Sequence, residues 1–173
     1  MSLSRKQLLG AAASFGVIAA ARFPGKAVAT TATAVNASVV GAWSLESFVV
    51  DTAAERERPR FGPNPVGYLI YTPSGRMSAT LMAAHRAKLD APNGAGSTKE
   101  ELNESLANFL SYAGRYEIRG NRVFHHVEVS VFTSLVGTTL ERQFTLDGDT
   151  LTIRTLPPEI WGTSNRLVWK RTA

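Results

Sequence analysis

The sequence of 173 residues contains no cysteine. This excludes a disulfide framework, a thiolate metal site, a cysteine nucleophile and a lipid-attachment motif. Nucleophile-elbow and phosphate-loop motifs are also missing, and the three histidines, His85, His125 and His126, do not have the spacing of a metal site. We therefore expect no metal and no cofactor, and we expect packing alone to stabilise the fold.

Surplus positive charge is confined to the first 29 residues. The net charge of the whole chain is +5, but Arg5, Lys6, Arg22 and Lys26 occur in a segment without acids. Once these four are set aside, 15 basic residues remain against 14 acidic ones, a net charge of +1. A chain with so little excess positive charge lacks the basic surface that binds nucleic acid, so no nucleic-acid partner is expected.

No apolar run is long enough for a typical membrane-spanning helix. The longest, Leu8 to Ala21, has 14 residues, whereas a spanning helix needs about 20. It follows Ser4-Arg5-Lys6-Gln7-Leu8-Leu9 and precedes the small-residue pattern Ala27-Val28-Ala29, which predicts an export signal over residues 1–29. The segment resembles a twin-arginine signal with Lys6 in the second arginine position. We expect a periplasmic or secreted protein without a stable membrane anchor after cleavage; retention of the segment as an anchor is the alternative.

The remainder reads as a flexible lead-in, residues 30–39, and one domain, residues 40–173. Eight apolar segments are joined mainly by tight polar turns, such as Arg119-Gly120-Asn121 and Asp147-Gly148-Asp149, which favour hairpins. The predicted strands are 43–50, 66–72, 76–82, 112–119, 123–131, 138–146, 150–155 and 164–170. This order predicts an all-β fold, an eight-stranded antiparallel up-and-down barrel.

Two segments interrupt the strands. Residues 56–65, rich in proline and charge, predict a long loop that crosses one end of the barrel. Thr98 and Glu101 have capping-box spacing, and they are followed by Leu102, Leu106, Phe109 and Leu110 at helical intervals. These residues predict one amphipathic helix near 98–112, either a lid over the barrel mouth or a cover for its outer wall.

Several motifs resemble a known family. Gly41-x-Trp43 resembles the Gly-x-Trp signature of lipocalins, and three longer blocks are similar to the lipocalin-like domain proteins of bacteria and fungi: residues 65–73, 112–116 and 125–130. The resemblance implies a calycin-type barrel that holds a small, mostly apolar molecule. In lipocalins the signature Trp closes the narrow end against an Arg near the last strand. The resemblance thus implies structural roles for Gly41, Trp43 and Arg166, the nearest match to that Arg.

Arg142 lies on the apolar face of the predicted strand 138–146. A guanidinium remains ionised at any relevant pH, and burying it without a partner is very costly. Either a carboxylate from the protein, with Glu46, Glu117 and Glu128 as candidates, or an anionic group of a ligand must therefore meet it.

Strand 123–131 carries apolar residues on both faces, so the sequence does not show which face points into the barrel. If the even-numbered face points inward, His126 and Glu128 form an acid/base pair in the lumen. If the face of alternating valines points inward, His125 is instead a hydrogen-bonded core residue.

The predicted ligand-binding residues are Arg142, His125, Tyr68, Tyr71, Tyr116 and Met77, with Tyr112 as a further aromatic residue of the lining. The sequence thus predicts an exported lipocalin-like protein that binds a small hydrophobic or amphipathic molecule. Two alternatives remain: a cyclase or isomerase that uses the same cavity, with His126 and Glu128 catalytic, as in secondary metabolism; or a barrel filled by its own side chains that presents an interaction surface. The sequence does not decide whether the protein is an enzyme, nor its oligomeric state.

Overall fold

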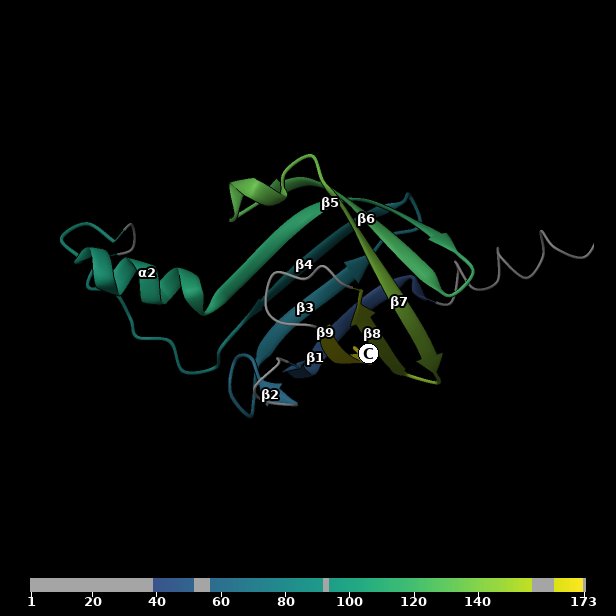
Figure 1. The fold of residues 1–173 in the computed structure, drawn as a ribbon, viewed down its shortest axis with the longest axis horizontal. Helices are drawn as coiled ribbons and strands as arrows, with labels where there is room; N and C mark the ends of the chain where they lie inside the picture. The colour runs from purple at the N-terminus through teal and green to yellow at the C-terminus, as the bar shows by residue number, and fades with distance from the viewer. Residues whose placement is uncertain (1–38, 52–56, 92–93, 157–163, 173) are drawn as a thin grey trace, which may run out of the picture.

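A computed structural model describes residues 39–51, 57–91, 94–156 and 164–172 (Figure 1). The export signal predicted for residues 1–29 lies outside the described residues, as does nearly all of the predicted lead-in. The elements are β1 (Gly41–Asp51), β2 (Arg58–Pro59), β3 (Val66–Tyr71), β4 (Arg76–Met82), α2 (Lys99–Ala107), β5 (Phe109–Arg119), β6 (Arg122–Ser130), the 3-10 turn η1 (Thr133–Leu135), β7 (Thr139–Asp147), β8 (Thr150–Thr155) and β9 (Ser164–Arg171). No helix in the described part of the chain has the length and apolar character needed to cross a membrane.

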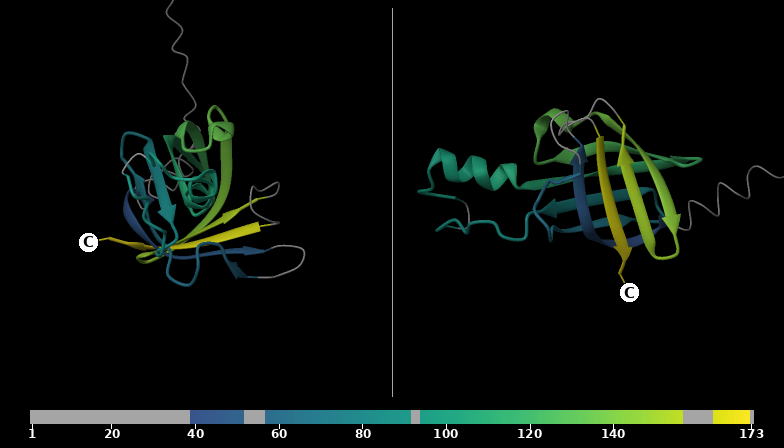
Figure 2. Two further views of the ribbon diagram at one scale, coloured as in Figure 1. Left: turned by 90° about the vertical axis from the view of Figure 1, so that its left-hand side faces the viewer. Right: turned by 60° about the horizontal axis from the view of Figure 1, so that its bottom comes forward.

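The strands form one closed antiparallel barrel. From β3 onward each strand pairs with the next in sequence, and β1 pairs with both β3 and β9, which joins the two ends of the sheet. Figure 2 shows β9 between β1 and β8 on the wall of the barrel. The two-residue β2 only extends the edge of β1. The predicted eight-stranded up-and-down barrel is therefore confirmed.

Strand alternation places the core inside the barrel. In β1 the buried residues alternate as Trp43 and Leu45, and again as Phe48 and Val50. The register shift between Leu45 and Ser47 adds one residue between the two pairs and keeps all four side chains on the inner face. Trp43 and Trp169 are among the largest fully buried side chains. The barrel thus buries its apolar residues against one another without disulfide bonds.

The helix is shorter than predicted. Thr98 is the N-cap and Glu101 completes the capping box, as expected, but α2 ends at Ala107 and Asn108 is its C-cap. Phe109 and Leu110 belong to β5, where alternation buries Leu110 and Tyr112. The helical spacing of apolar residues therefore spans two elements, and the predicted extension beyond Ala107 was wrong.

The position of α2 matches neither expected role. No residue of this fully described helix is buried, and Leu102 and Leu106 are 39% and 44% exposed. The helix projects past the barrel at the start of β5 (Figures 1 and 2). Two arginines hold its C-terminal part: Arg60 donates to the carbonyl of Ala107 at 2.8 Å and Arg86 to that of Ser105 at 2.9 Å, where cations complement the helix dipole.

The loop before β3 packs at one end of the barrel. Phe61 is buried, and its ring contacts the ring of Phe48 edge to face, with centroids 5.4 Å apart. The backbone N–H of Arg60 donates to the carbonyl of Phe48 at 2.9 Å. This loop therefore packs against Phe48, which also lines the interior cavity.

Candidate functional site

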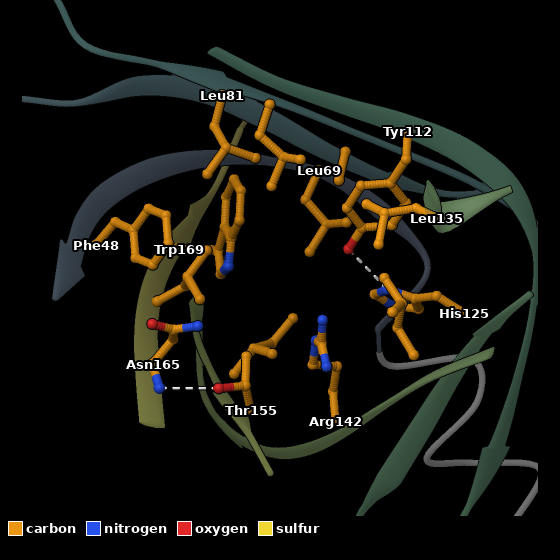
Figure 3. A pocket seen from close by; sticks show the side chains of 15 residues that line it. Phe48, Leu69, Leu81, Tyr112, His125, Leu135, Arg142, Thr155, Asn165 and Trp169 are labelled. Atoms are coloured by element: carbon orange, nitrogen blue, oxygen red, sulfur yellow. Dashed lines mark hydrogen bonds between the residues drawn. The ribbon is translucent and has the colours of Figure 1, made fainter. Parts of the chain in front are cut away.

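The barrel encloses a cavity among the inner faces of its strands. The empty space between its walls and at its opening totals about 560 Å³. Figure 3 shows side chains from several strands converging on this space. The lining consists of Phe48, Leu69, Ala79, Leu81, Leu110, Tyr112, His125, Leu135, Leu140, Arg142, Ile153, Thr155, Asn165, Leu167 and Trp169.

A row of polar side chains crosses three neighbouring strands in the cavity wall. Arg142 on β7 is the cross-strand partner of Thr155 on β8, and the backbone N–H of Asn165 on β9 donates to the Thr155 hydroxyl at 2.8 Å. All three are buried, Arg142 being 9% exposed. In Figure 3 the Arg142 guanidinium points into the open space and faces the Trp169 side chain.

Arg142 brings positive charge into a lining without acids. None of the described lining residues is Asp or Glu. The carboxylates considered as its internal partners lie elsewhere: Glu46 is exposed, Glu117 pairs with Arg119, and Glu128 pairs with Arg76. Arg142 itself donates to the carbonyl of its neighbour Glu141 at 3.0 Å. The prediction of an inward Arg142 is thus correct, whereas those three carboxylates do not accompany it.

His125 is held between two tyrosines. The odd-numbered face of β6 points inward, so His125 is buried, with its Nε2 2.7 Å from the Tyr71 hydroxyl and its Nδ1 3.0 Å from the Tyr112 hydroxyl. Burial, together with the positive charge of Arg142 and the neighbouring His126, lowers the pKa of His125 to about 3. Burial likewise raises the pKa of Tyr71 well above its ordinary value. At neutral pH His125 and Tyr71 are therefore uncharged.

The predicted acid/base pair does not form in the lumen. His126 lies on the outer face of β6, where its ring nitrogens contact the Thr139 hydroxyl at 2.9 Å and the Glu117 carboxylate at 3.3 Å. Glu128 also faces outward and pairs with arginines of β4 and β5, which lower the pKa of its carboxyl. The condition for that pair, an inward even-numbered face, is not met because the valine face lies inside.

Of the other predicted ligand-binding residues, two lie beside the site and two lie away from it. Tyr71 is buried and reaches the site through His125. Tyr116 lies beside it, with ring centroids 4.6 Å apart, and donates to the carbonyl of Thr72 at 3.0 Å. Met77 lies in the core outside the cavity lining, and Tyr68 is exposed on the outer face of β3.

Sequence reasoning did not single out the polar residues of the last two strands. Thr155, Asn165 and Trp169 all line the cavity. Period-two alternation from Asn165 through Leu167 to Trp169 was a usable signal, because it places these three side chains on one face.

The lipocalin signature is present with a different arginine. Trp43 is fully buried and its Nε1 donates to the carbonyl of Val39 at 2.9 Å. The guanidinium over its ring is that of Arg171, not Arg166, which instead pairs with Glu57 on the surface. Gly41 has φ +139°, and a Cβ at this position would lie 2.9 Å from Arg171 Nη1. The expected role of Arg166 was therefore wrong, and Arg171 fills it.

The described residues contain no cluster of three or more His, Asp or Glu side chains suited to a metal ion. The chemistry available inside the barrel is instead that of neutral and cationic hydrogen-bond donors in an apolar enclosure. Such a site can orient a small molecule through its oxygen atoms.

Comparison with known proteins agrees with this architecture. One curated relative is the 4′-hydroxy-3′-methoxypropiophenone carrier protein ppsC of Aspergillus oryzae (strain ATCC 42149 / RIB 40), 31% identical over 106 residues, which cover 55% of this chain and 96% of the relative. The family model described as a lipocalin-like domain matches residues 40–172, which include every strand of the barrel. The chain therefore belongs to the lipocalin-like domain family.

Proposed function

We propose that this protein is a carrier that binds a small, mostly apolar molecule in the lumen of its barrel. The observation that supports this most strongly is the cavity itself, which has mainly apolar walls and a few buried polar groups that converge on it. In this role Arg142 and Tyr112 anchor the polar end of the ligand, and Phe48, Leu81 and Leu110 contact its apolar body.

The name of the curated relative supports the same assignment. It is named as a carrier of 4′-hydroxy-3′-methoxypropiophenone, a molecule with one aromatic ring, a ketone and two further oxygen atoms. A compound that combines an aromatic ring with oxygen atoms suits a cavity that combines apolar walls with hydrogen-bond donors. We therefore take oxygenated aromatic ketones as the first ligand class to test.

The test uses two Ala→Leu variants. Ala79 lines the cavity, so A79L fills part of it, whereas Ala42 precedes the inward Trp43 in β1 and faces outward. Calorimetric titration with 4′-hydroxy-3′-methoxypropiophenone is expected to show binding to wild type and A42L, and an affinity about tenfold lower for A79L, the size of effect that overfilling a packed site produces. Equal affinity in wild type and a folded A79L would contradict binding in the lumen.

We also propose that the protein is exported. The support is the sequence pattern of residues 1–29, with its paired positive charge, apolar stretch and Ala27-Val28-Ala29. Fractionation of the native host followed by N-terminal sequencing should find a periplasmic or extracellular form that begins at Thr30, and R5Q should retain the uncleaved form in the cytoplasm. A wild-type protein found only in the cytoplasm with residues 1–29 intact would contradict export.

A further inference from the structure

Trp169 presents a buried hydrogen-bond donor to the cavity. Its side chain is 2% exposed, and its Nε1 has no hydrogen-bond partner among the described residues. In Figure 3 the indole nitrogen points into the open space that Arg142 also faces. Trp43 provides the contrast within the same barrel, because its Nε1 donates to the carbonyl of Val39.

A donor in this position is costly unless something meets it. A buried N–H without an acceptor loses its hydrogen bond to water without replacement, and the great majority of buried polar groups are satisfied. Indole nitrogen donates and does not accept. The group that satisfies Trp169 must therefore be an acceptor, and the cavity leaves space for one that the ligand brings.

The hydrogen bonds between His125 and its two neighbouring tyrosines determine the direction of the Tyr112 O–H. A neutral imidazole has one donor and one acceptor nitrogen. His125 Nε2 is the one hydrogen-bond partner of the Tyr71 hydroxyl within the described part of the chain, and Tyr71 otherwise adjoins apolar side chains such as Val39 and Phe144. Tyr71 therefore donates to Nε2, because its O–H proton would otherwise be buried without an acceptor.

This assignment fixes the direction of the other hydrogen bond. With Nε2 as acceptor, the proton of His125 is on Nδ1, which donates to the hydroxyl oxygen of Tyr112 at 3.0 Å. The O–H of Tyr112 does not then point at His125, and Tyr112 lines the cavity. His125 is therefore the positioning residue that sets the direction of the Tyr112 O–H.

Within the described lining, the indole N–H of Trp169 is a buried donor that no residue meets, whereas the Thr155 hydroxyl and the Asn165 amide each supply both a donor and an acceptor. We propose that the indole N–H of Trp169 forms an acceptor-selective subsite that binds a carbonyl or ether oxygen of the ligand. This deepens the proposed carrier function and rests on it: the cavity selects molecules that bear acceptor oxygens over hydrocarbons of the same shape.

The test compares butyrophenone with butylbenzene, which replaces the carbonyl by a methylene group. Affinities of both probes are measured for wild type and W169F, and the quantity compared is the ratio of ketone to hydrocarbon affinity. We expect the ratio to fall about five- to tenfold in W169F, the value of one hydrogen bond to a buried donor. The ratio removes the packing change that W169F introduces, because both probes experience it.

A second readout needs no variant. The indole N–H signals of the three tryptophans are followed by NMR, with Trp169 assigned through its contacts to Leu151, its cross-strand partner. The Trp169 proton should move downfield with butyrophenone and not with butylbenzene, while that of Trp43, already hydrogen-bonded, should not respond in this way.

The outcomes separate the two proposals. An unchanged affinity ratio in W169F, or no downfield shift of Trp169 at saturation with ketone, would overturn the acceptor subsite and leave binding in the lumen standing. Failure of folded wild type to bind either probe would contradict both.

Discussion

The guanidinium of Arg171 lies over the indole ring of Trp43, with its central carbon 4.1 Å from the ring centroid. Its Nη1 also donates to the carbonyl of Val40 at 3.0 Å, and its Nε pairs with Asp149 at 3.2 Å. These contacts join the last strand of the barrel to the first and to the β7–β8 turn. They therefore stabilise the closure of the barrel at this end.

Removing this arginine should destabilise the fold. We expect R171A to lower the free energy of unfolding by about 1–3 kcal/mol, from the lost cation–π contact and the hydrogen bond to a backbone carbonyl. R166A is the control, since its partner Glu57 is exposed and such pairs contribute about 0–1 kcal/mol. Urea unfolding measures both; a larger loss in R166A than in R171A would contradict the structural assignment.

At Gly114 the strands β5 and β6 lie too close together for a side chain. A Cβ at this position would lie 1.9 Å from the carbonyl oxygen of His126, where the register between β5 and β6 shifts. Because both strands must move, we expect G114A to cost more than about 3 kcal/mol. The control is G120A: Gly120 has φ +60° but open space around it, so only backbone strain of about 1–2 kcal/mol is expected. Thermal unfolding would contradict this explanation if the two variants lost equal stability.

His125 should make the fold sensitive to acid. In the unfolded chain a histidine binds a proton below about pH 6.5, whereas burial keeps folded His125 neutral down to about pH 3. Between these limits the unfolded state holds more protons, so stability is complete above pH 6.5 and decreases as the pH falls toward 3. From this group alone we expect a loss of about 2 kcal/mol between pH 7.5 and 5.

The measurement is urea unfolding across that pH range. H125F should be less stable at pH 7.5 but show a smaller loss on acidification. V127A, a core substitution on the same inward face of β6, should keep the wild-type pH dependence. An identical pH dependence in H125F and wild type would show that His125 does not cause it.

Local signals in the sequence were sufficient to predict the barrel. Period-two alternation and turns such as Asp147-Gly148-Asp149 depend on neighbouring residues only, and the strands they predict are those that pair in the structure. The capping box at Thr98 was equally local and is also present. The end of the helix could not be predicted from local signals, because Phe109 and Leu110 fit a helical pattern and a strand pattern equally well.

The site could not be predicted in the same way, because it is formed by contacts between residues far apart in the sequence. The inward face of β6 is set by Tyr71 and Tyr112, which are 54 and 13 residues from His125 and satisfy both of its ring nitrogens. Neither contact has a signature in β6 itself. The arginine over Trp43 likewise depends on the register of β9 against β1, which a single sequence does not specify.

The measurement that tests the carrier function most directly is native mass spectrometry of the protein purified from its own host, with analysis of the organic extract. We predict a reproducible added mass, equal to that of a small oxygen-bearing compound in the extract, which is lost or strongly reduced in A79L and retained in A42L. A folded wild-type protein that repeatedly carries no added mass, and binds no oxygenated aromatic ketone when these are supplied, would contradict a ligand-carrying lumen.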